Sequence, residues 1–437
     1  MALEQAATRP GTGVMDTGNA YRGYVLVILT LVYAVNFMDR YALVAMAEHI
    51  RLDLGLTDGQ IGLLTGFAFS LLYAVVGFPM AFIADRVGHV RVIAASIALW
   101  SFMTMLGGRA TGFLTLAATR VGVGIGEAGG TPPAHAILSG TFSARALPGA
   151  MSIFSCGSGI GLTLGLVLGG VLATEFGWRM ALVLLGIPGL LLAPVVYFTL
   201  RNPTQPAHGA MSLAAARSAL GRVFRDSKIV MLALSMSVAG FAGFANLVWL
   251  PSLHLRRFGL EAGTGVDLGF ALGLANVIGI LVGGPLCAFL EQRTRITPYW
   301  LCSFAALASL PLFAIAGVAD TSMLFSVAAA LGLFAHSLLI APVMTQMQRL
   351  AGVQDKALAS ALLLFGIAVI GSGAGPYVAG WISDRYAELG TDASLTWGLQ
   401  CTLLAYVAAV VLFLRAGQVG RSIATSSSVG TVRGETP

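Results

Sequence analysis

Long apolar runs and short polar segments alternate along the chain. Twelve runs are mostly apolar over about 17–25 residues or more, enough for a helix to cross the ~30 Å hydrocarbon core of a bilayer. They are apolar on every face, whereas the strands of a membrane β-barrel alternate apolar and polar positions. The pattern predicts membrane-spanning helices at 22–47, 57–84, 91–108, 112–139, 145–174, 178–200, 228–255, 264–290, 296–317, 321–348, 357–384 and 393–415.

The longest polar segment lies in the middle of the chain and leaves six predicted helices on each side. Such duplication is typical of transporters that move one half against the other. The predicted fold class is an all-α membrane protein with 12 transmembrane helices in a pseudo-symmetric 6+6 arrangement. Its expected parts are a cytoplasmic N-terminal segment 1–21, a six-helix bundle 22–200, a cytoplasmic central loop 201–227, a second bundle 228–415 and a disordered cytoplasmic tail 416–437.

The composition excludes a soluble globular domain. Hydrophobic residues make up 57% of the chain and charged residues 10%, against about 45–50% and 25% in soluble domains. The four cysteines lie inside apolar runs without a pairing or metal-binding spacing, and neither a P-loop nor a His-Glu-x-x-His pattern is present. We therefore expect no disulfide, metal, cofactor or catalytic residue, and we exclude an enzyme and an ATP-driven pump.

The positive charge is unevenly distributed between the two sides of the membrane. If both termini are cytoplasmic, 17 of the 25 Lys and Arg residues fall in segments on that side, 6 on the other side and 2 inside helices. Cytoplasmic loops collect Lys and Arg, so we predict that both termini are cytoplasmic. The net charge of +6 is then explained by membrane orientation, and no nucleic-acid partner is expected.

Four charged residues lie deep in predicted helices: Asp39 and Arg40 in 22–47, and Arg120 and Glu127 in 112–139. A charge at this depth costs ~2.5–3.5 kcal/mol on insertion scales, so it persists where it pairs or lines a polar cavity. At a rise of ~1.5 Å per residue, Asp39 and Arg120 lie about 7 and 8 Å outward of the middle of their helices, and Glu127 about 2 Å inward. Arg120 and Glu127 also share one helix face, so we expect a single cluster.

This cluster of two acids and two bases can be neutral as a whole. Protonating one carboxylate would release an arginine to bind an anion, which is the physical basis of proton-coupled binding. Asp39 and Glu127 are therefore candidate proton-coupling residues, and Arg40 and Arg120 are candidate substrate ligands or charge partners. The alternative is two fixed ion pairs that hold helices together, although buried ion pairs stabilise a fold only weakly.

The second predicted helix ends in the segment A-F-I-A-D-R-V-G-H-V-R, at 81–91. An acid at a helix end, followed by glycine and clustered bases, suits a charge-based gate that breaks and re-forms at the cytoplasmic face. Asp85, Arg86, Gly88 and Arg91 are its candidate residues. Ordinary positive loop charge would explain the bases but not Asp85.

A separate feature is a row of glycines at four-residue spacing in the fifth predicted helix, at 157, 161, 165 and 169. It makes one flat helix face, against which another helix can pack closely or slide.

The second half of the chain has few deep charges, and its polar candidates are Asn246, Trp249, Asn276 and His336. This asymmetry suits an amphipathic anion, with its head near the arginines of the first half and its chain against the apolar second half. A lone membrane histidine is more often structural than a ligand, and that alternative stays open for His336. The candidate substrate-binding residues are Asn36, Arg40, Arg120, Asn246 and His336.

The Asp-Arg-x-Gly segment at 85–88, the Arg-x-x-x-Gly-x-Gly pattern at 120–126 and the 6+6 layout resemble the major facilitator superfamily over nearly the whole chain. Asn-x-x-Asp-Arg at 36–40 and Gly-x-Gly-Glu-Ala at 124–128 are similar to the Spinster family of lipid transporters. The resemblance implies a central cavity that the deep charged cluster faces, alternating access, and proton-linked transport of lysolipids or sphingoid phosphates.

The chain departs from the superfamily pattern in two places. Ala81 stands where glycine is usual, and His89-Val90 where two bases are common, which predicts a weak gate. Leu162 follows Gly161 where antiporters typically have proline, so this motif does not support antiport.

The predicted function is proton-coupled secondary transport of an amphipathic anion, such as a lysophospholipid or a sphingoid phosphate, with the proton gradient as energy source. The alternative in the same fold is a carrier of a small organic anion or a drug. A receptor without transport fits less well, because the loops are too short for an output domain. We expect a monomeric, multi-pass protein of a bacterial inner membrane, with the bilayer, protons and the substrate as its partners.

Overall fold

The computed structural model describes residues 18–143, 145–202, 221–259, 264–294, 296–352 and 355–430. Most of the predicted N-terminal segment and central loop, and 431–437 of the tail, lie outside these ranges. The helices of the first half are α1 (Asn19–Leu54), α2 (Asp58–Thr65), α3 (Phe67–Val87), α4 (His89–Gly107), α5 (Phe113–Ala128), α6 (Thr131–Thr141) and α7 (Leu147–Thr199). Those of the second half are α9 (Ser227–Phe258), α10 (Thr264–Thr294), α11 (Pro298–Val318), α12 (Ser322–Ser337), α13 (Ile340–Leu350), α14 (Lys356–Gly366), the π-helix η1 (Ile367–Ala374), α15 (Gly375–Arg385), the short η2 (Ala387–Leu389), α16 (Thr391–Thr402) and α17 (Leu404–Gly430).

These helices account for the twelve predicted spans. In the described part of the chain, ten helical segments are long and apolar enough to cross a membrane. One of them, α7, holds two spans, because its backbone turns at Gly177, where φ is 76° and ψ is 152°. Glycine adopts such a positive φ without a steric penalty. The short helices α5 and α6 follow one another and form the remaining span.

Several spans are interrupted where the sequence predicted one continuous helix. Gly66, with φ −106° and ψ −96°, separates α2 from α3. Gly129 and Gly130 separate α5 from α6, and residues 338–339 separate α12 from α13. Between α14 and α15 the chain forms the π-helix η1, a form that is frequent at functional sites. Irregular backbone inside a membrane is tolerated where protein or a cavity surrounds it. The break at Gly66 packs against Ser372 and Gly373 of η1, between the halves, whereas the break at Gly129 and Gly130 packs against α4 within the N-terminal half.

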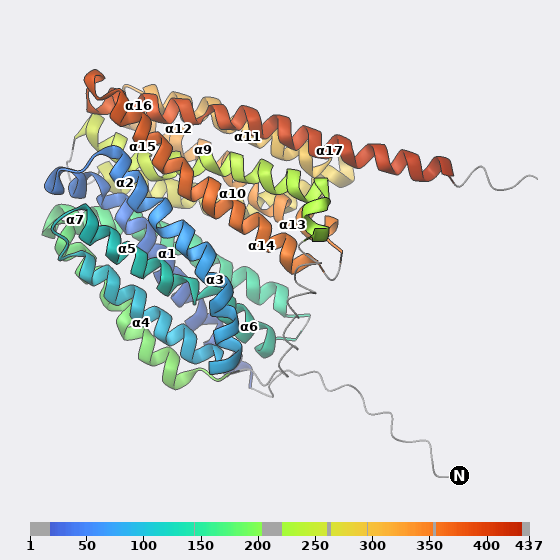
Figure 1. The fold of residues 1–437 in the computed structure, drawn as a ribbon, viewed down its shortest axis with the longest axis horizontal. Coiled ribbons are helices and arrows are strands. Elements are labelled where there is room, and N and C mark those ends of the chain that lie inside the picture. Colours follow the sequence, from blue (N-terminus) through green and yellow to red (C-terminus); the bar gives the residue numbers. More distant parts are fainter. Residues whose placement is uncertain are drawn as a thin grey trace, which may run out of the picture.

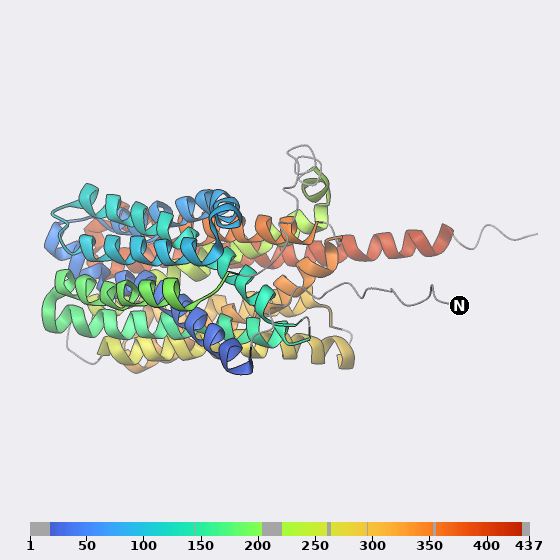
Figure 2. The same ribbon diagram turned by 90° about the horizontal axis from the view of Figure 1, so that it is seen from below.

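Helices α1 to α7 pack mainly with one another and form the N-terminal half, and α9 to α17 form the C-terminal half. Figure 1 shows the two groups side by side, with blue to green helices in one and yellow to red helices in the other. The halves meet where α2 packs on α15, α3 on η1, and α7 on α10. In the view of Figure 2 the start of α1 and the end of α17 lie toward the same end of the molecule. We call this the terminal end, and the opposite end, where α1 turns into α2, the far end.

The predicted flat glycine face of α7 packs against α1. A Cβ atom on Gly157 would lie 2.7 Å from the carbonyl oxygen of Thr30, and one on Gly165 would lie 2.6 Å from that of Met38. Gly161 and Gly169 face Ala34 and Ala42 at equally short range. The two helix backbones therefore touch within one half, so this glycine face holds the N-terminal half together.

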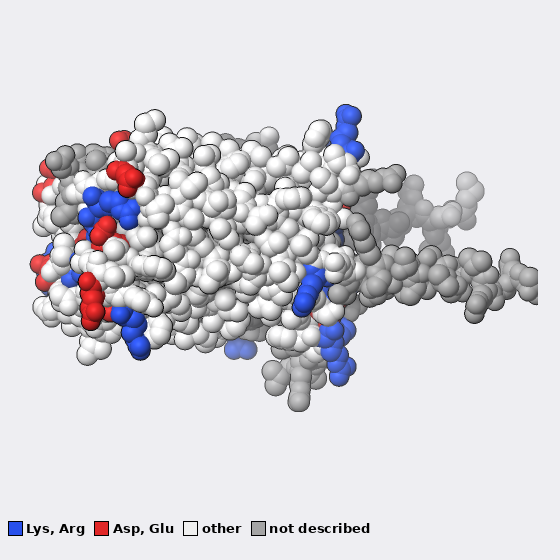
Figure 3. Space-filling view, turned by 90° about the horizontal axis from the view of Figure 1, so that it is seen from above, with Lys and Arg blue, Asp and Glu red and all other residues white. Residues whose placement is uncertain are grey.

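The face of the molecule drawn in Figure 3 has a wide region without charge. Figure 3 shows an uncharged middle region, with acids and bases together at the far end and only Lys and Arg visible at the terminal end. Large apolar side chains are exposed near the middle of the spans, for example Leu281 of α10 and Leu307 of α11, which are 56% and 52% exposed. Exposure of this kind is expected where lipid replaces water as the solvent.

The last helix differs from the expected disordered tail. α17 continues to Gly430, so 416–430 is helical although it is rich in Ser, Thr and Gly. This stretch has no proline, and extending an existing helix avoids the unfavourable step of nucleating a new one.

Candidate functional site

A cavity of about 340 Å³ lies between the two halves. Aromatic side chains and Arg40 line it on the N-terminal half, and mainly Leu, Ile, Val and Met line it on the C-terminal half. Its few polar side chains on the C-terminal half are Asn276, His336 and Ser372. The size and the mixture of apolar walls with a few polar groups are typical of a small-molecule site.

Arg40 reaches this cavity from the middle of α1 and pairs with Glu127 of α5. The guanidinium Nη2 lies 2.7 Å from Glu127 Oε2, and the side chains are 22% and 0% exposed. Phe69 and Phe37 lie against the guanidinium, with ring centres 4.2 and 4.9 Å from its central carbon. Aromatic faces attract a cation, so Arg40 is held at the cavity wall by a carboxylate and by rings.

Asp39 and Arg120 are also buried, 0% and 3% exposed, but they form no comparable pair. Asp39 Oδ2 accepts a hydrogen bond of 3.4 Å from the Thr104 hydroxyl. Within the described residues, no carboxylate lies within 4.0 Å of the Arg120 guanidinium. The sequence thus predicted four charges that come together around α1 and α5, but only Arg40 and Glu127 are in direct contact.

Both buried carboxyl groups have one oxygen with no hydrogen-bond partner, Asp39 Oδ1 and Glu127 Oε1. An unsatisfied buried acceptor is costly, and a proton on that oxygen would remove the charge from the group. The Nε atoms of Arg40 and Arg120 are unpartnered as well. Apart from the contact between Arg40 and Glu127, the hydrogen bonding of the cluster is therefore incomplete.

The other predicted substrate-binding residues occupy different surroundings. His336 lines the cavity, and its Nδ1 lies 3.0 Å from the Tyr406 hydroxyl. Asn36 is buried beside the cluster and lines a smaller cavity next to Trp100. Asn246 is buried and donates 2.9 Å to the carbonyl oxygen of Ala242 in its own helix, and it does not line the central cavity.

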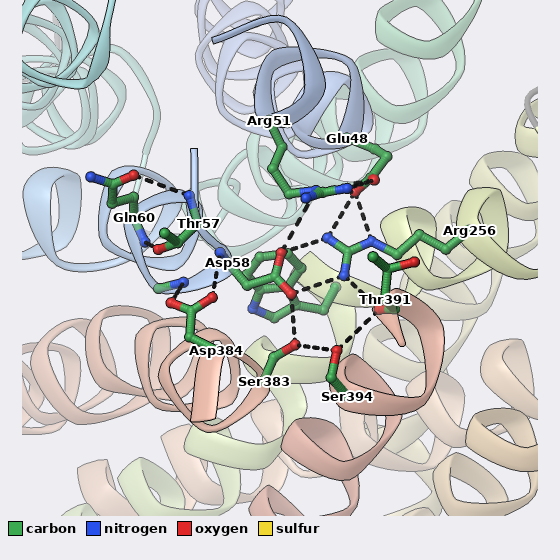
Figure 4. A network of polar contacts seen from close by, with 12 residues as sticks. Glu48, Arg51, Thr57, Asp58, Gln60, Arg256, Ser383, Asp384, Thr391 and Ser394 are labelled. Carbon is green, nitrogen blue, oxygen red and sulfur yellow. Dashed lines mark hydrogen bonds and ion pairs between the residues drawn. The ribbon is translucent and has the colours of Figure 1, made fainter. Parts of the chain in front are cut away.

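A charged network that the sequence did not predict joins the two halves at the far end (Figure 4). Arg256 of α9 is 3% exposed and donates 2.8 Å to Glu48 and 2.5 and 2.8 Å to the two carboxylate oxygens of Asp58. Arg51 lies 2.7 Å from Glu48 on the same helix. Arg256 thus connects the C-terminal half to the end of α1 and to the start of α2.

A second contact of this network uses the helix N-terminus of α2. The carboxylate of Asp384, at the end of α15, accepts hydrogen bonds of 2.9 and 2.8 Å from the backbone N–H groups of Asp58 and Gly59. Ser383 donates 2.6 Å to the Asp58 carboxylate. An acid at a helix N-terminus satisfies free N–H groups and meets the positive end of the helix dipole. Figure 4 shows that these contacts and Arg256 close one continuous polar layer.

Only the Asp384 part of this network has a signal in the sequence, a repeated pattern. The segment G-W-I-S-D-R at 380–385 repeats the spacing of A-F-I-A-D-R at 81–86. The charges at 48, 58 and 256 stand at predicted helix ends, where they are indistinguishable from ordinary loop charges.

The predicted cytoplasmic gate residues lie at the end of α3 and the start of α4. Asp85 has a side chain that is 64% exposed and lies 3.3 Å from His89. Gly88 joins the two helices with a φ of 107°, and Arg91 approaches the carbonyl oxygen of Val87 at 3.4 Å. In the part of the chain that the structure describes, neither these residues nor Arg86 bond to the C-terminal half.

Comparison with known proteins agrees with this architecture. Residues 29–376 match the profile of the Major Facilitator Superfamily. An MFS-type efflux pump of Mycolicibacterium smegmatis is 35% identical over 94% of this chain and 95% of its own. A probable L-galactonate transporter of Escherichia coli is 26% identical over 64% of this chain and 66% of its own.

A solved structure is also similar over almost the full length. It is that of a bacterial homologue of the human lysosomal transporter Spinster, in an inward-facing and unoccupied conformation. Its identity is 26%, its TM-score is 0.82, and the match covers 92% of this chain and 98% of that one.

Proposed function

The chain belongs to the major facilitator superfamily, and on that premise we propose that it is a proton-coupled secondary transporter of an amphipathic anion. The substrate class is a lysophospholipid or a sphingoid phosphate. The observation that carries the proposal is the contact between Arg40 and Glu127 at the wall of the central cavity. The superfamily and the fold are those of transporters rather than enzymes.

Coupling follows from the charges in this contact. While Glu127 is ionised, it holds the Arg40 guanidinium, and an anion in the cavity would have to compete with it. A proton on Glu127 removes the negative charge, and Arg40 then has a free charge to offer the anionic head of a substrate. The apolar wall of the C-terminal half suits the chain of an amphipathic molecule. Asp39 and Arg120 form a second acid and base for the same exchange.

Alternating access requires that one side be closed at a time. The Arg256 and Asp384 contacts close the far end, and the exposed Lys and Arg of the terminal end support its assignment to the cytoplasm. The conformation described is then closed to the outside, and Asp85 to Arg91 would gate the opposite side. We place the protein in a bacterial inner membrane as a monomer, with both termini in the cytoplasm.

The test is substrate-dependent proton movement in proteoliposomes that contain a pH-sensitive dye. The probes are 1-oleoyl lysophosphatidic acid, sphingosine 1-phosphate and galactonate. Proton movement with a lipid probe, its loss in Glu127→Gln, and retained counterflow exchange in that variant are expected. Arg40→Ala is expected to weaken binding of an anion more than that of its neutral analogue. Binding without proton movement in the wild-type protein would refute proton coupling.

A second candidate function is transport of a small organic anion or a drug. The names of the E. coli and M. smegmatis relatives favour it. In the same assay, proton movement with galactonate and none with either lipid would replace the lipid proposal with this one.

A further inference from the structure

Of the three polar side chains on the C-terminal wall of the cavity, Ser372 bonds to Ser70 and to the carbonyl oxygen of Ala368, which leaves His336 of α12 and Asn276 of α10 among apolar neighbours. His336 is 6% exposed, and Asn276 is half-buried. In the described C-terminal half, no Asp or Glu lines the cavity. A polar group in an apolar wall has to be satisfied by the protein or by the ligand. The hydrogen-bond donor or acceptor that each side chain can offer to a ligand depends on the hydrogen bond that it already makes with the protein.

Asn276 hydrogen-bonds to the protein through its amide nitrogen. Nδ2 donates 3.0 Å to the hydroxyl of Ser337, which is 0% exposed. An amide has two donor hydrogens on nitrogen and an acceptor oxygen. With the nitrogen committed to Ser337, the carbonyl oxygen Oδ1 is the free acceptor of this side chain.

His336 is oriented by a chain of hydroxyl groups. Its Nδ1 lies 3.0 Å from the hydroxyl of Tyr406, which has Ser309 as a second hydrogen-bonding neighbour. The Ser309 hydroxyl donates 2.8 Å to the carbonyl oxygen of Ala305, so toward Tyr406 it can only accept. With Tyr406 donating to Ser309, its oxygen accepts from Nδ1–H of His336, which is one of the two tautomers that fit the 3.0 Å contact. A neutral imidazole with its proton on Nδ1 has an acceptor at Nε2.

The ring is also fixed from the opposite side. Gly243 of α9 lines the cavity next to His336, and a Cβ atom there would clash with the Cε1–Nε2 edge of the imidazole ring. The absent side chain leaves the space that the imidazole fills between α9 and Tyr406. The ring is therefore held between a glycine and a tyrosine.

From this arrangement we propose that His336 and Asn276 form a second pole of the substrate site and accept hydrogen bonds from a hydroxyl group of the bound anion. The inference rests on the proposed function, since it places the anionic group at Arg40 on the other wall. Two acceptors without a nearby carboxylate favour a neutral donor, a hydroxyl, over an ammonium group. The preferred substrate is thus an amphipathic anion that carries a free hydroxyl near its head.

The experiment compares two probes that differ by one hydroxyl group. They are 1-oleoyl lysophosphatidic acid and its analogue that lacks the hydroxyl on the second glycerol carbon. Binding to the full-length protein in lipid nanodiscs is measured for the wild type, His336→Phe, Asn276→Leu and Tyr406→Phe. His336→Phe keeps a ring between Gly243 and Tyr406, and Asn276→Leu keeps the size of the side chain. The deoxy probe is the internal control for folding and for the anion site.

The wild-type protein is expected to bind the hydroxylated probe about tenfold more tightly, the worth of a well-formed hydrogen bond. His336→Phe and Asn276→Leu are each expected to bring this ratio to about one or two, with both probes measured on the same variant. Tyr406→Phe is expected to lower the ratio although His336 is present. If His336→Phe does not fold, Asn276→Leu decides the question.

A wild-type ratio of one, or a ratio that both variants leave unchanged, overturns the inference while the proposed function stands. Failure of the wild-type protein to bind either lipid probe overturns the proposed substrate class, and the inference with it.

Discussion

Replacing Arg256 by Gln is expected to open the far end of the molecule. Arg256 is 3% exposed and binds two carboxylates of the other half, Glu48 and Asp58. Removing one partner of a buried, hydrogen-bonded ion pair typically costs about 3–5 kcal/mol. Water reaches these carboxylates once the halves separate, so the cost falls on the closed conformation alone. At about 1.4 kcal/mol per factor of ten, even the lower value shifts the ratio of closed to open molecules by about two orders of magnitude.

The opening can be measured as a distance between spin labels at Arg109 and Glu388. These residues are exposed, lie at the far end, and belong to different halves. The four native cysteines are replaced by serine before the two label sites are introduced. A longer label distance, or a new population at long distance, is expected for Arg256→Gln in nanodiscs.

The matched control is Arg257→Gln, one position along the same helix. Arg257 donates to the carbonyl oxygen of Gly317 and to the Thr396 hydroxyl, and it lies 3.7 Å from Asp392. All three partners belong to the C-terminal half, so this variant loses an arginine without losing a contact between halves. Its distance distribution should match that of the wild type. An equal shift in both variants, or none in Arg256→Gln, would refute the assignment of the closure to Arg256.

Three further predictions concern single contacts. Asp384→Asn is expected to open the far end in the same assay, but less than Arg256→Gln. The charge at the α2 N-terminus is lost, while the amide oxygen still accepts a hydrogen bond from the backbone N–H of Asp58 or Gly59. An effect as large as that of Arg256→Gln would contradict this ranking. Gly161→Leu should lower the free energy of unfolding by about 1–3 kcal/mol through overpacking against α1, as measured by thermal unfolding in detergent. The control is Gly170→Leu, which should change it little because a Cβ atom at Gly170 meets nothing within 4 Å. Two hydrogen bonds from Arg222 lower the pKa of Asp355. This contact should therefore persist below about pH 4, near the usual carboxyl pKa of about 4, and be lost only as the pH falls through the lowered pKa. Carbon NMR of labelled aspartate should show the lowered pKa, and Arg222→Gln should bring it back to the usual value.

The twelve spans and the deep charged cluster could be predicted from the sequence because each depends on a local pattern. Bilayer thickness fixes the length of an apolar run, and the helical rise fixes the depth of a charge within it. Arg40, Glu127, Asp39 and Arg120 accordingly lie in one buried region, where the side chains of α1 and α5 approach one another. Their partners could not be predicted, because pairing depends on how α1 is rotated relative to α5. Arg40 faces Glu127 at 2.7 Å, whereas Arg120 does not approach a carboxylate within 4.0 Å.

The helix breaks and the far-end network depend on tertiary contacts that a local pattern does not contain. The break at Gly66 is stabilised by close packing, since a Cβ there would lie 3.1 Å from the carbonyl oxygen of Ser372 in the other half. Arg256 and Glu48 are far apart in the sequence and meet only because α1 and α9 lie side by side. The rotation of a polar side chain about its helix is also beyond a local pattern. Asn246 is buried, its amide bonds to its own helix, and it is not among the residues that line the central cavity.

The two faces of α7 indicate which contacts a rocking motion can break. One face is fixed against α1 by its glycines, within one half, while the other meets α10 across the halves. There, Cβ atoms on Gly269 and Gly273 would lie 3.0 Å from Cβ of Leu166 and 2.7 Å from that of Thr163. Contacts between glycine backbones and small side chains carry few directional bonds, so they can slide and re-form. We therefore expect opening of the far end to lose the bonds of Arg256, Asp384 and Ser383 together with the packing of α2 on α15, while the contact between α7 and α10 slides.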